Sequence, residues 1–354
     1  MLRTLCLVLL LSSCGASTPA SAPPPEPDPP AAQVADPGEG DAPVLALHEW
    51  GLVDVDLASR AVELSAGPGA PAVPVVARKP VLYAHLIDRD AASLDLRVRL
   101  PDGGAVLEHW PPAAIEGGAI PWHLEVRRGA CPAPAGPSRD LARACDAPDG
   151  FCEVAELPRY VTRDHDCLEV GGQRAALLFY RASIPLEALP LRVERGAGLT
   201  ARVTSDAPRP PGTILRVSSG LSGPWPPGHL VLARAALPTA PGAVEIPVGE
   251  AALDPSAERS AMERTLTSEL GLTADEARVF LEAWADELFG AAPAARESRR
   301  RPAPRQRDEL LYWLSAEEID RVAALEASAP IVTRRAFLVR VALGAVSTAA
   351  PAPR

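Results

Sequence analysis

The sequence predicts an α+β fold that is predominantly β, a sandwich or an open barrel, with a C-terminal helical hairpin insertion. Between about residues 44 and 248, short segments alternate apolar and polar residues, which is the pattern of half-buried strands. Clusters of proline and glycine separate these segments, as turns do in β-rich proteins. After Asp254 the apolar spacing changes to that of helices. The chain has 354 residues, of which 47% are hydrophobic, and this is enough for one large core.

The clearest strand is SLDLRVRL, in which Leu94, Leu96 and Val98 share one face and charged residues occupy the other. The turn sequence PDGG at residues 101–104 follows it and predicts a hairpin with the next strand, AVLEHW. The nearly continuous apolar run AALLFYR predicts a central strand, because such strands are buried on both faces. The remaining expected strands of this region are WHLEVRR, LTARVTS, TILRVSS, HLVLARA and AVEIPV.

Two helices are expected after Asp254. Met262, Leu266 and Leu270 repeat at helical spacing, and the sequence GLT then ends the first helix. Thr273 and Glu276 have the spacing of a capping box, which predicts the start of the second helix. That helix carries one apolar stripe, formed by Ala277, Phe280, Leu281, Trp284 and Leu288. The stripe indicates that the helix packs against another layer.

The C-terminal part is expected to return to strands. LLYWL at residues 310–314 reads as a strand, and Ser315 with Glu318 predicts a short helix that extends to about Ala327. RAFLVRVAL then alternates and predicts the final strand.

The N-terminus predicts export and lipidation. Arg3 precedes the apolar run LCLVLLL, which is too short to span a bilayer and is typical of a signal peptide. The run ends in LSSCG, which resembles a bacterial lipobox, so we expect cleavage before Cys14 and acylation of its thiol. The alternative is a cleavable signal with an incidental cysteine. Several acyl chains on one residue give stable membrane anchoring. We therefore expect an outer-membrane lipoprotein whose domain faces the periplasm or the cell surface, with the membrane as a partner through the lipid.

Composition suggests the following organisation. We expect a signal peptide at 1–13, a lipidated, proline-rich tether at 14–43, a β-rich domain at 44–250, a helical hairpin with closing strands of the same domain at 251–343, and a disordered tail at 344–354. The net charge of −10 argues against a nucleic-acid partner. The sequence gives no indication of the oligomeric state.

Four cysteines remain after Cys6 leaves with the signal and Cys14 is acylated, and all four lie in an insertion at residues 131–167. An even number in an exported chain predicts two disulfides, for which three connectivities exist. We favour Cys131 with Cys167 at the neck of the insertion, because these residues end one strand and begin the next. Cys145 would then pair with Cys152. The alternative of a zinc site lacks a C-x-x-C pair.

No established catalytic motif is present: the chain has no P-loop, no G-x-S-x-G and no H-E-x-x-H. What remains is a set of scattered imidazoles and carboxylates, namely His48-Glu49, His85, Glu108-His109, His123 and His165-Asp166. Three of these would suffice for a metal if the strands brought them together. His123 lies on the polar side of its strand and His165 lies in the cysteine-rich insertion. We therefore favour structural roles for them and expect no metal and no cofactor.

Glu49 has the same strand parity as Leu45, Leu47 and Val53, which predicts a carboxylate on an apolar face, and Gly51 is expected to allow a bulge or a close backbone approach. A buried carboxylate needs a partner or a raised pKa. Arg181 shares a parity with Phe179 on the expected central strand and is the favoured partner. Such a pair is either structural or the floor of a site, and the sequence does not choose between them.

Several short motifs resemble a family of exported bacterial proteins, with or without a lipid anchor, that carry an N-terminal HEWG. In this chain they are HEWG (48–51), KPVLY (79–83), EHWPP (108–112), Trp122, LLFYR (177–181), Ala283-Trp284 and LLYWL (310–314). The resemblance spans roughly residues 46–343 and implies a shared fold, with no assigned activity. The family more often has an aromatic residue at the position of His85, which argues against His85 as a ligand.

We expect a binding or structural role at the cell envelope, with an envelope polysaccharide or protein as partner. The alternative is an envelope-polymer hydrolase, dependent on carboxylates or on a metal. It would use Glu49 and Glu108 with His48 or His109, and Arg181 completes the set of candidate residues. Retaining glycosidase chemistry would require two carboxyl groups about 5–5.5 Å apart.

Overall fold

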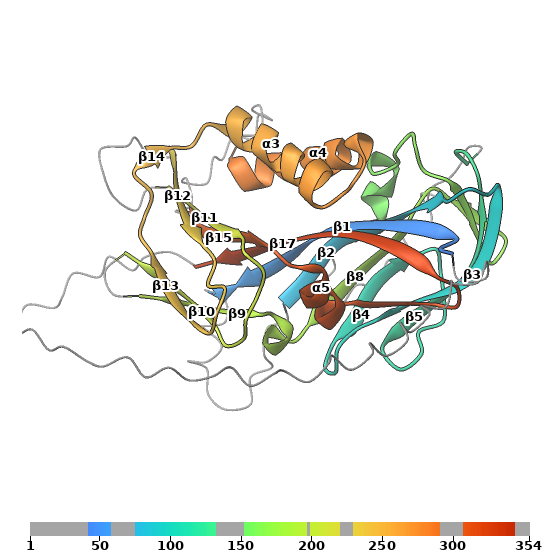
Figure 1. Ribbon diagram of the computed structural model, residues 1–354, viewed down its shortest axis with the longest axis horizontal. Coiled ribbons are helices and arrows are strands. Elements are labelled where there is room, and N and C mark those ends of the chain that lie inside the picture. The colour runs from blue at the N-terminus through green and yellow to red at the C-terminus, as the bar shows by residue number, and fades with distance from the viewer. Residues whose placement is uncertain are drawn as a thin grey trace, which may run out of the picture. The chain divides into compact units, whose positions relative to one another are not determined.

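A nine-stranded sheet is the largest element of the fold (Figure 1). The computed structural model describes residues 42–57, 75–131, 152–196, 199–219, 229–290 and 307–343, and all of these belong to one compact unit. Across the sheet the strands are β14 (Ala251–Ala252), β12 (Leu230–Ala236), β11 (Thr213–Ser219), β15 (Arg307–Trp313), β17 (Ile331–Ala342), β1 (Leu45–Asp56), β2 (Val75–Leu86), β8 (Leu178–Ile184) and β4 (Ala105–Trp110). β1 and β17 are parallel, and the other pairs are antiparallel.

Two smaller antiparallel sheets cover one face of the large sheet. The three-stranded sheet contains β13 (Gly242–Ile246), β10 (Ala201–Ser205) and β9 (Leu191–Arg195). The five-stranded sheet contains β16 (Ala324–Ala327), β3 (Ala91–Arg99), β5 (Ala119–Arg127), β6 (Cys167–Val170) and β7 (Gln173–Ala175). Apolar side chains from all three sheets form one core, which we call the sheet core. The layers are open rather than closed into a barrel, so the predicted α+β class with a predominantly β, sandwich-like architecture is confirmed.

Helices cover the other face of the large sheet, where Figure 1 shows α3 and α4 in orange. α3 (Pro255–Arg264) begins after Asp254, whose side chain accepts from the backbone N–H of Ser256, and it continues into a π-helical turn at Thr265–Glu269. α4 (Ala274–Phe289) follows, and the short 3₁₀ helix η1 (Val154–Arg159) packs on the same side. These elements and the sheet share a second apolar core, the helix core. The predicted helical hairpin is therefore confirmed, between β14 and β15.

Two expectations about strands are wrong. The turn at residues 101–104 forms, with Gly104 N–H donating to Pro101 O at 2.8 Å, but β3 and β4 on its two sides belong to different sheets and do not make a hairpin. The apolar run AALLFYR at residues 175–181 provides the first part of β8, which is buried at every position. It lies next to the edge strand β4 and not at the centre of the sheet, because helices and the smaller sheets bury both of its faces even there.

The last helix is shorter than expected. α5 (Ala316–Val322) begins with the expected capping box of Ser315 and Glu318, but it ends at Val322 and not near Ala327. The following residues form β16, in which Leu325 pairs with Val98 of β3 and packs against the sheet core. Tertiary pairing thus outweighs the helical tendency of this alanine-rich segment.

The neck of the cysteine-rich insertion is closed as predicted. Cys131 and Cys167 form a disulfide with a Cα–Cα distance of 4.5 Å. Cys152 is also disulfide-bonded, and its expected partner Cys145 lies outside the described residues.

The predicted signal peptide at 1–13, nearly all of the tether at 14–43 including Cys14, and the tail at 344–354 also lie outside the described residues. Within the described part of the chain, no helix is long and apolar enough to cross a membrane.

Candidate functional site

The HEWG segment divides its side chains between the two cores. Glu49 points into the sheet core with Leu47 and Val53, as its parity predicted, whereas His48 and Trp50 point towards the helices. A Cβ atom on Gly51 would lie 3.2 Å from Pro80 Cα, so the glycine permits the expected close backbone approach. The pairing register of β1 with β2 shifts between Trp50 and Leu52, at this glycine.

Glu49 is fully buried, and its cation is Arg335. Arg335 Nε donates to Glu49 Oε2 at 2.5 Å, and the Tyr180 hydroxyl donates to Oε1 at 2.8 Å. Burial raises the pKa of Glu49, and the charge and hydrogen bond of Arg335 oppose that rise. Arg335 also binds Asp320 and the carbonyl of Ala323, so the pair is tied into the frame of the domain.

The predicted pairing of Glu49 with Arg181 is wrong. β2 separates β1 from β8, and Arg181 has the parity of Phe179, which belongs to the helix core. Arg181 instead faces Glu108 across the β4–β8 register, with Nη1 donating to Oε1 at 3.1 Å. The other oxygen of Glu108 accepts from the backbone N–H groups of Glu153 and Val154 at 2.7 and 3.1 Å. Burial raises the pKa of Glu108 against these bonds.

The two candidate carboxylates therefore lie on opposite faces of the large sheet. Glu49 belongs to the sheet-core face, and Glu108 belongs to the helix-core face. Each is bound by an arginine and has further hydrogen bonds. A carboxylate pair of the kind that retaining glycosidases use is not formed by these residues.

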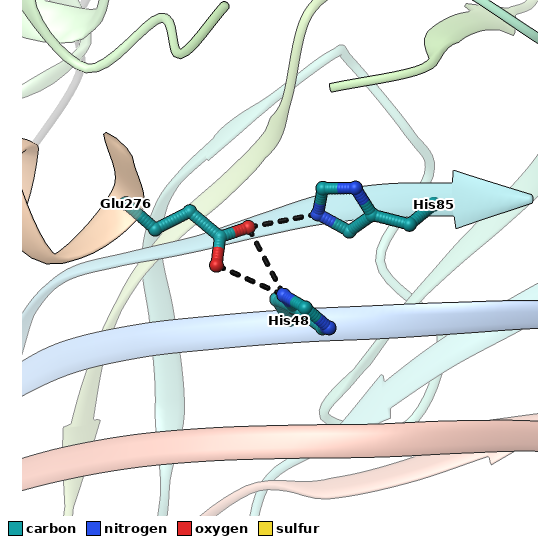
Figure 2. Close-up of side chains that lie close together, drawn as sticks. All are labelled: His48, His85 and Glu276. Carbon is teal, nitrogen blue, oxygen red and sulfur yellow. Dashed lines mark hydrogen bonds and ion pairs between the residues drawn. The ribbon is translucent and has the colours of Figure 1, made fainter. Parts of the chain in front are cut away.

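The structure brings together three other side chains: His48 of β1, His85 of β2 and Glu276 of α4 (Figure 2). His48 Nδ1 lies 2.9 Å from Glu276 Oε2 and 3.2 Å from Oε1. His85 Nε2 lies 2.8 Å from Oε1. The two imidazole rings contact each other, with their centroids 4.4 Å apart. One ligand atom from each residue lies within 4.8 Å of the others. We call this group the His-His-Glu cluster.

The carboxylate of the His-His-Glu cluster is held by the helix that carries it. Thr273 and Glu276 form the predicted capping box: Thr273 N–H donates to Glu276 Oε2 at 2.8 Å, and Glu276 N–H donates to Thr273 Oγ1 at 3.2 Å. The position in the first turn of α4 also favours negative charge there. Glu276 has an exposed fraction of 0%, so its orientation is fixed by packing and by these bonds.

α4 lies along β1, with polar contacts at both ends. At the other end of the helix, Glu287 Oε1 accepts from Arg340 Nη1 at 2.6 Å and from Arg78 Nη1 at 3.0 Å, and Asp54 of β1 binds the same two arginines. Between the ends, the predicted apolar stripe of α4 is buried in the helix core, as Phe280, Trp284 and other residues of the stripe show. The His-His-Glu cluster thus lies at a junction of helix and sheet that ion pairs and apolar packing hold together.

Electrostatics distinguish Glu276 from the other buried carboxylates. Its burial acts to raise the pKa, but the hydrogen bonds from His48 and His85 outweigh it and lower the pKa of Glu276 to about 2. For His85, burial acts to lower the pKa, and the hydrogen bond and charge of Glu276, with Asp164 and Asp166, raise it overall. The carboxylate is therefore ionised over the physiological range of pH.

The remaining sequence candidates do not join this cluster. His109 Nε2 contacts the backbone of Ala113, and His123 pairs with Asp95 on the surface. His165 is buried, with Nδ1 2.6 Å from Thr162 O.

The sequence favoured no metal site, and it did not reveal that Glu276 contacts His48 and His85. Thr273 and Glu276 were visible only as a helix cap. The aromatic preference at position 85 in the resembling family argued against His85, which nonetheless meets His48 here.

A set of two imidazoles and one carboxylate is a donor set for divalent transition metals. The His48 and His85 side chains are 12% and 19% exposed, so the cluster is partly open to solvent. No protein-family model and no curated protein matches this chain, and the interpretation of the site therefore rests on its own geometry.

Proposed function

We propose that this chain is a lipid-anchored envelope protein that acts by binding, and that His48, His85 and Glu276 bind a divalent transition-metal ion, with zinc as the best fit. The observation that carries the proposal is the convergence of three ligand atoms within 4.8 Å, contributed by two adjacent strands and a helix that are far apart in sequence. The lipobox-like LSSCG sequence and the proline-rich tether support the envelope location.

The chemistry of the donors fits such an ion. Imidazole nitrogens and a carboxylate are zinc ligands, and three protein ligands leave one position open in a tetrahedral site. Glu276 Oε1 lies near both imidazole nitrogens, whereas Oε2 accepts the backbone N–H of Thr273. Such a hydrogen bond to a ligating carboxylate is the outer-shell support that metal sites use to orient their ligands.

The binding role is favoured over the hydrolase alternative. Hydrolysis by paired carboxylates would need Glu49 and Glu108 on one side of the sheet, and they lie on opposite sides. Metal-dependent hydrolysis would have to use the same His-His-Glu cluster. An envelope polysaccharide or protein remains the proposed partner of the domain.

The test is a metal titration of the full chain in detergent after treatment with a chelator. We expect one equivalent of zinc to bind. Glu276→Gln should lower the affinity at least about tenfold, since even outer-shell changes cost this much. Glutamine also satisfies a capping box, so this variant keeps the start of α4. His85→Phe should have a similar effect on zinc affinity.

The matched control is His123→Phe, because His123 also pairs with a carboxylate, at 2.8 Å, but lies on the surface. Its zinc binding should equal that of the parent protein. Equal zinc affinity in the parent protein and the Glu276→Gln variant would contradict the proposal.

A further inference from the structure

Arg334 is the neighbour of His48 on the side opposite His85. β17 and β1 are parallel, and Arg334 is the register partner of His48, whereas His85 comes from β2 on the other edge of β1. Paired residues on adjacent strands lie about 4.8 Å apart and point to the same face. Arg334 therefore stands on the helix side of the sheet, directly beside the His-His-Glu cluster.

The loop before α4 leaves room for the stem of Arg334. A Cβ atom on Gly271 would lie 2.8 Å from Arg334 Cδ and 3.0 Å from its Nε, so a side chain there would displace the arginine, and the φ of +75° also favours glycine. This loop leads directly to Thr273, which binds the Glu276 carboxylate. The arginine is thus positioned along the rim of the cluster.

The guanidinium of Arg334 has no partner within the described part of the chain. It is exposed and makes no hydrogen bond or ion pair there. In contrast, the other two arginines of β17, Arg335 and Arg340, are both bound by carboxylates. A guanidinium suits carboxylate and phosphate groups, since it presents two parallel donors to two oxygens.

The fixed charges decide when an anion can bind. The Glu276 carboxylate lies 2.9 Å from His48 Nδ1 and 2.8 Å from His85 Nε2, so in the metal-free protein an anion that enters the cluster meets a carboxylate, which repels it. A divalent ion reverses that balance and offers an open coordination position. Anion binding should therefore require the metal.

We infer that the metal ion at His48, His85 and Glu276 binds an oxyanion, a phosphate or carboxylate group, at its open position, and that Arg334 donates hydrogen bonds to the same group. This inference rests on the proposed metal-binding function. It makes Arg334 a specificity-determining residue for the ligand and not a ligand of the metal.

The test uses the full chain in detergent loaded with one equivalent of cobalt(II), whose visible spectrum reports its coordination. Inorganic phosphate and acetate are the two probes, and they separate a phosphate preference from a carboxylate preference. We expect a saturable spectral change with at least one of them. Arg334→Ala should leave the anion-free cobalt spectrum unchanged and weaken anion binding about tenfold, the loss of one charge-assisted contact. Arg334→Lys should retain part of the affinity.

The matched control is Arg174→Ala. Arg174 lies on β7 of the five-stranded sheet, is also exposed, and makes no hydrogen bond or ion pair with the described residues. Its variant should bind the anion like the parent protein.

Equal anion affinity in the Arg334→Ala and parent proteins would overturn the inference, as would anion binding to the metal-free protein or no anion effect on the cobalt spectrum. In these outcomes cobalt still binds. Failure of cobalt to bind would instead refute the proposed function itself.

Discussion

Arg335 and Glu49 lie opposite each other on the parallel strands β17 and β1, and their side chains form a buried ion pair between the first and last strands that the structure describes. Their exposed fractions are 2% and 0%. Because the two strands are joined by no local connection, this pair helps to fix which strands become neighbours. The glutamate of HEWG is therefore bound within the frame of the domain, whereas the histidine beside it belongs to the proposed metal site.

Removing either member of this pair should strongly destabilise the domain. Glu49→Gln or Arg335→Met leaves one charge buried without its partner, which typically costs about 3–5 kcal/mol. The double variant should lose much less than the sum, because the residues act as a unit. Arg181→Met, by contrast, breaks the separate pair with Glu108, so its effect should add to that of Glu49→Gln. Urea unfolding of the parent protein, the three single variants and the two double variants measures these terms, and additivity between Glu49 and Arg335 would contradict the pairing.

In the metal-free protein, the His-His-Glu cluster should stabilise the fold only within a window of pH. The lowered pKa of Glu276, about 2 against a usual 4.5, gives stability that is present above 4.5 and is lost as the pH falls towards 2. The raised pKa of His85 gives stability that is complete below its usual value of 6.5 and is lost as the pH rises through the raised pKa. The stability difference between the parent protein and Glu276→Gln should therefore peak between pH 4.5 and 6.5.

Urea midpoints measured across this pH range in the presence of a chelator check the expectation. If the urea midpoints of the parent protein and Glu276→Gln differ by the same amount from acidic to alkaline pH, the imidazoles do not interact with the carboxylate.

Zinc should stabilise the start of α4 more than its end. At free zinc one hundred times above the dissociation constant, the expected gain is about 2.7 kcal/mol. Amide hydrogen exchange should slow around Thr273 and Glu276, which join the proposed metal site to the helix. The end of α4 near Glu287 is bound by Arg340 and Arg78, so its exchange should change little and provides an internal control. If amide exchange slows equally at both ends of α4, zinc acts on the whole domain and not at the proposed site.

The disulfide between Cys131 and Cys167 should contribute on the order of 3–4 kcal/mol, because it closes a long loop in the unfolded chain. A Cys131→Ala, Cys167→Ala double variant should unfold at a correspondingly lower urea concentration. Asp166, next to this bridge, accepts from the backbone N–H groups of Leu86 and Gly129 at 2.6 Å, and so the end of β2 that carries His85 should also loosen. An unchanged urea midpoint would refute a stabilising role for the bridge.

Acylation of Cys14 is tested by its substitution. Cys14→Ser should move the protein from the membrane fraction to the soluble fraction, because the lipid is the proposed anchor. Membrane partitioning that is unaffected by the substitution would argue against the lipobox.

Local features of the structure could be predicted from the sequence, because their causes are local. The alternation at residues 94–100 gave β3, the Thr273–Glu276 and Ser315–Glu318 pairs marked the starts of two helices, and parity placed Glu49 inward. Each depends on neighbours within a few positions along the chain.

The pairing of distant elements could not be predicted in this way. Arg335 was missed because it is 286 residues from Glu49, and nothing in one sequence reveals that the two strands are parallel neighbours. Glu276 is 228 residues from His48, and its role as a cap concealed its second contact. The same limitation hid the separation of β3 and β4 into two sheets, since a turn sequence specifies a reversal and not the strand that the chain pairs with afterwards.

The most direct test of the central claim is X-ray absorption at the zinc edge of the full chain loaded with one equivalent of zinc. The account predicts a first shell of nitrogen and oxygen only, at about 2.0–2.2 Å, with outer-shell scattering from two imidazoles. That imidazole scattering should fall in His48→Ala and in His85→Ala. A sulfur shell near 2.3 Å, or imidazole scattering that persists in both variants, would contradict the assignment of His48, His85 and Glu276 as the metal site.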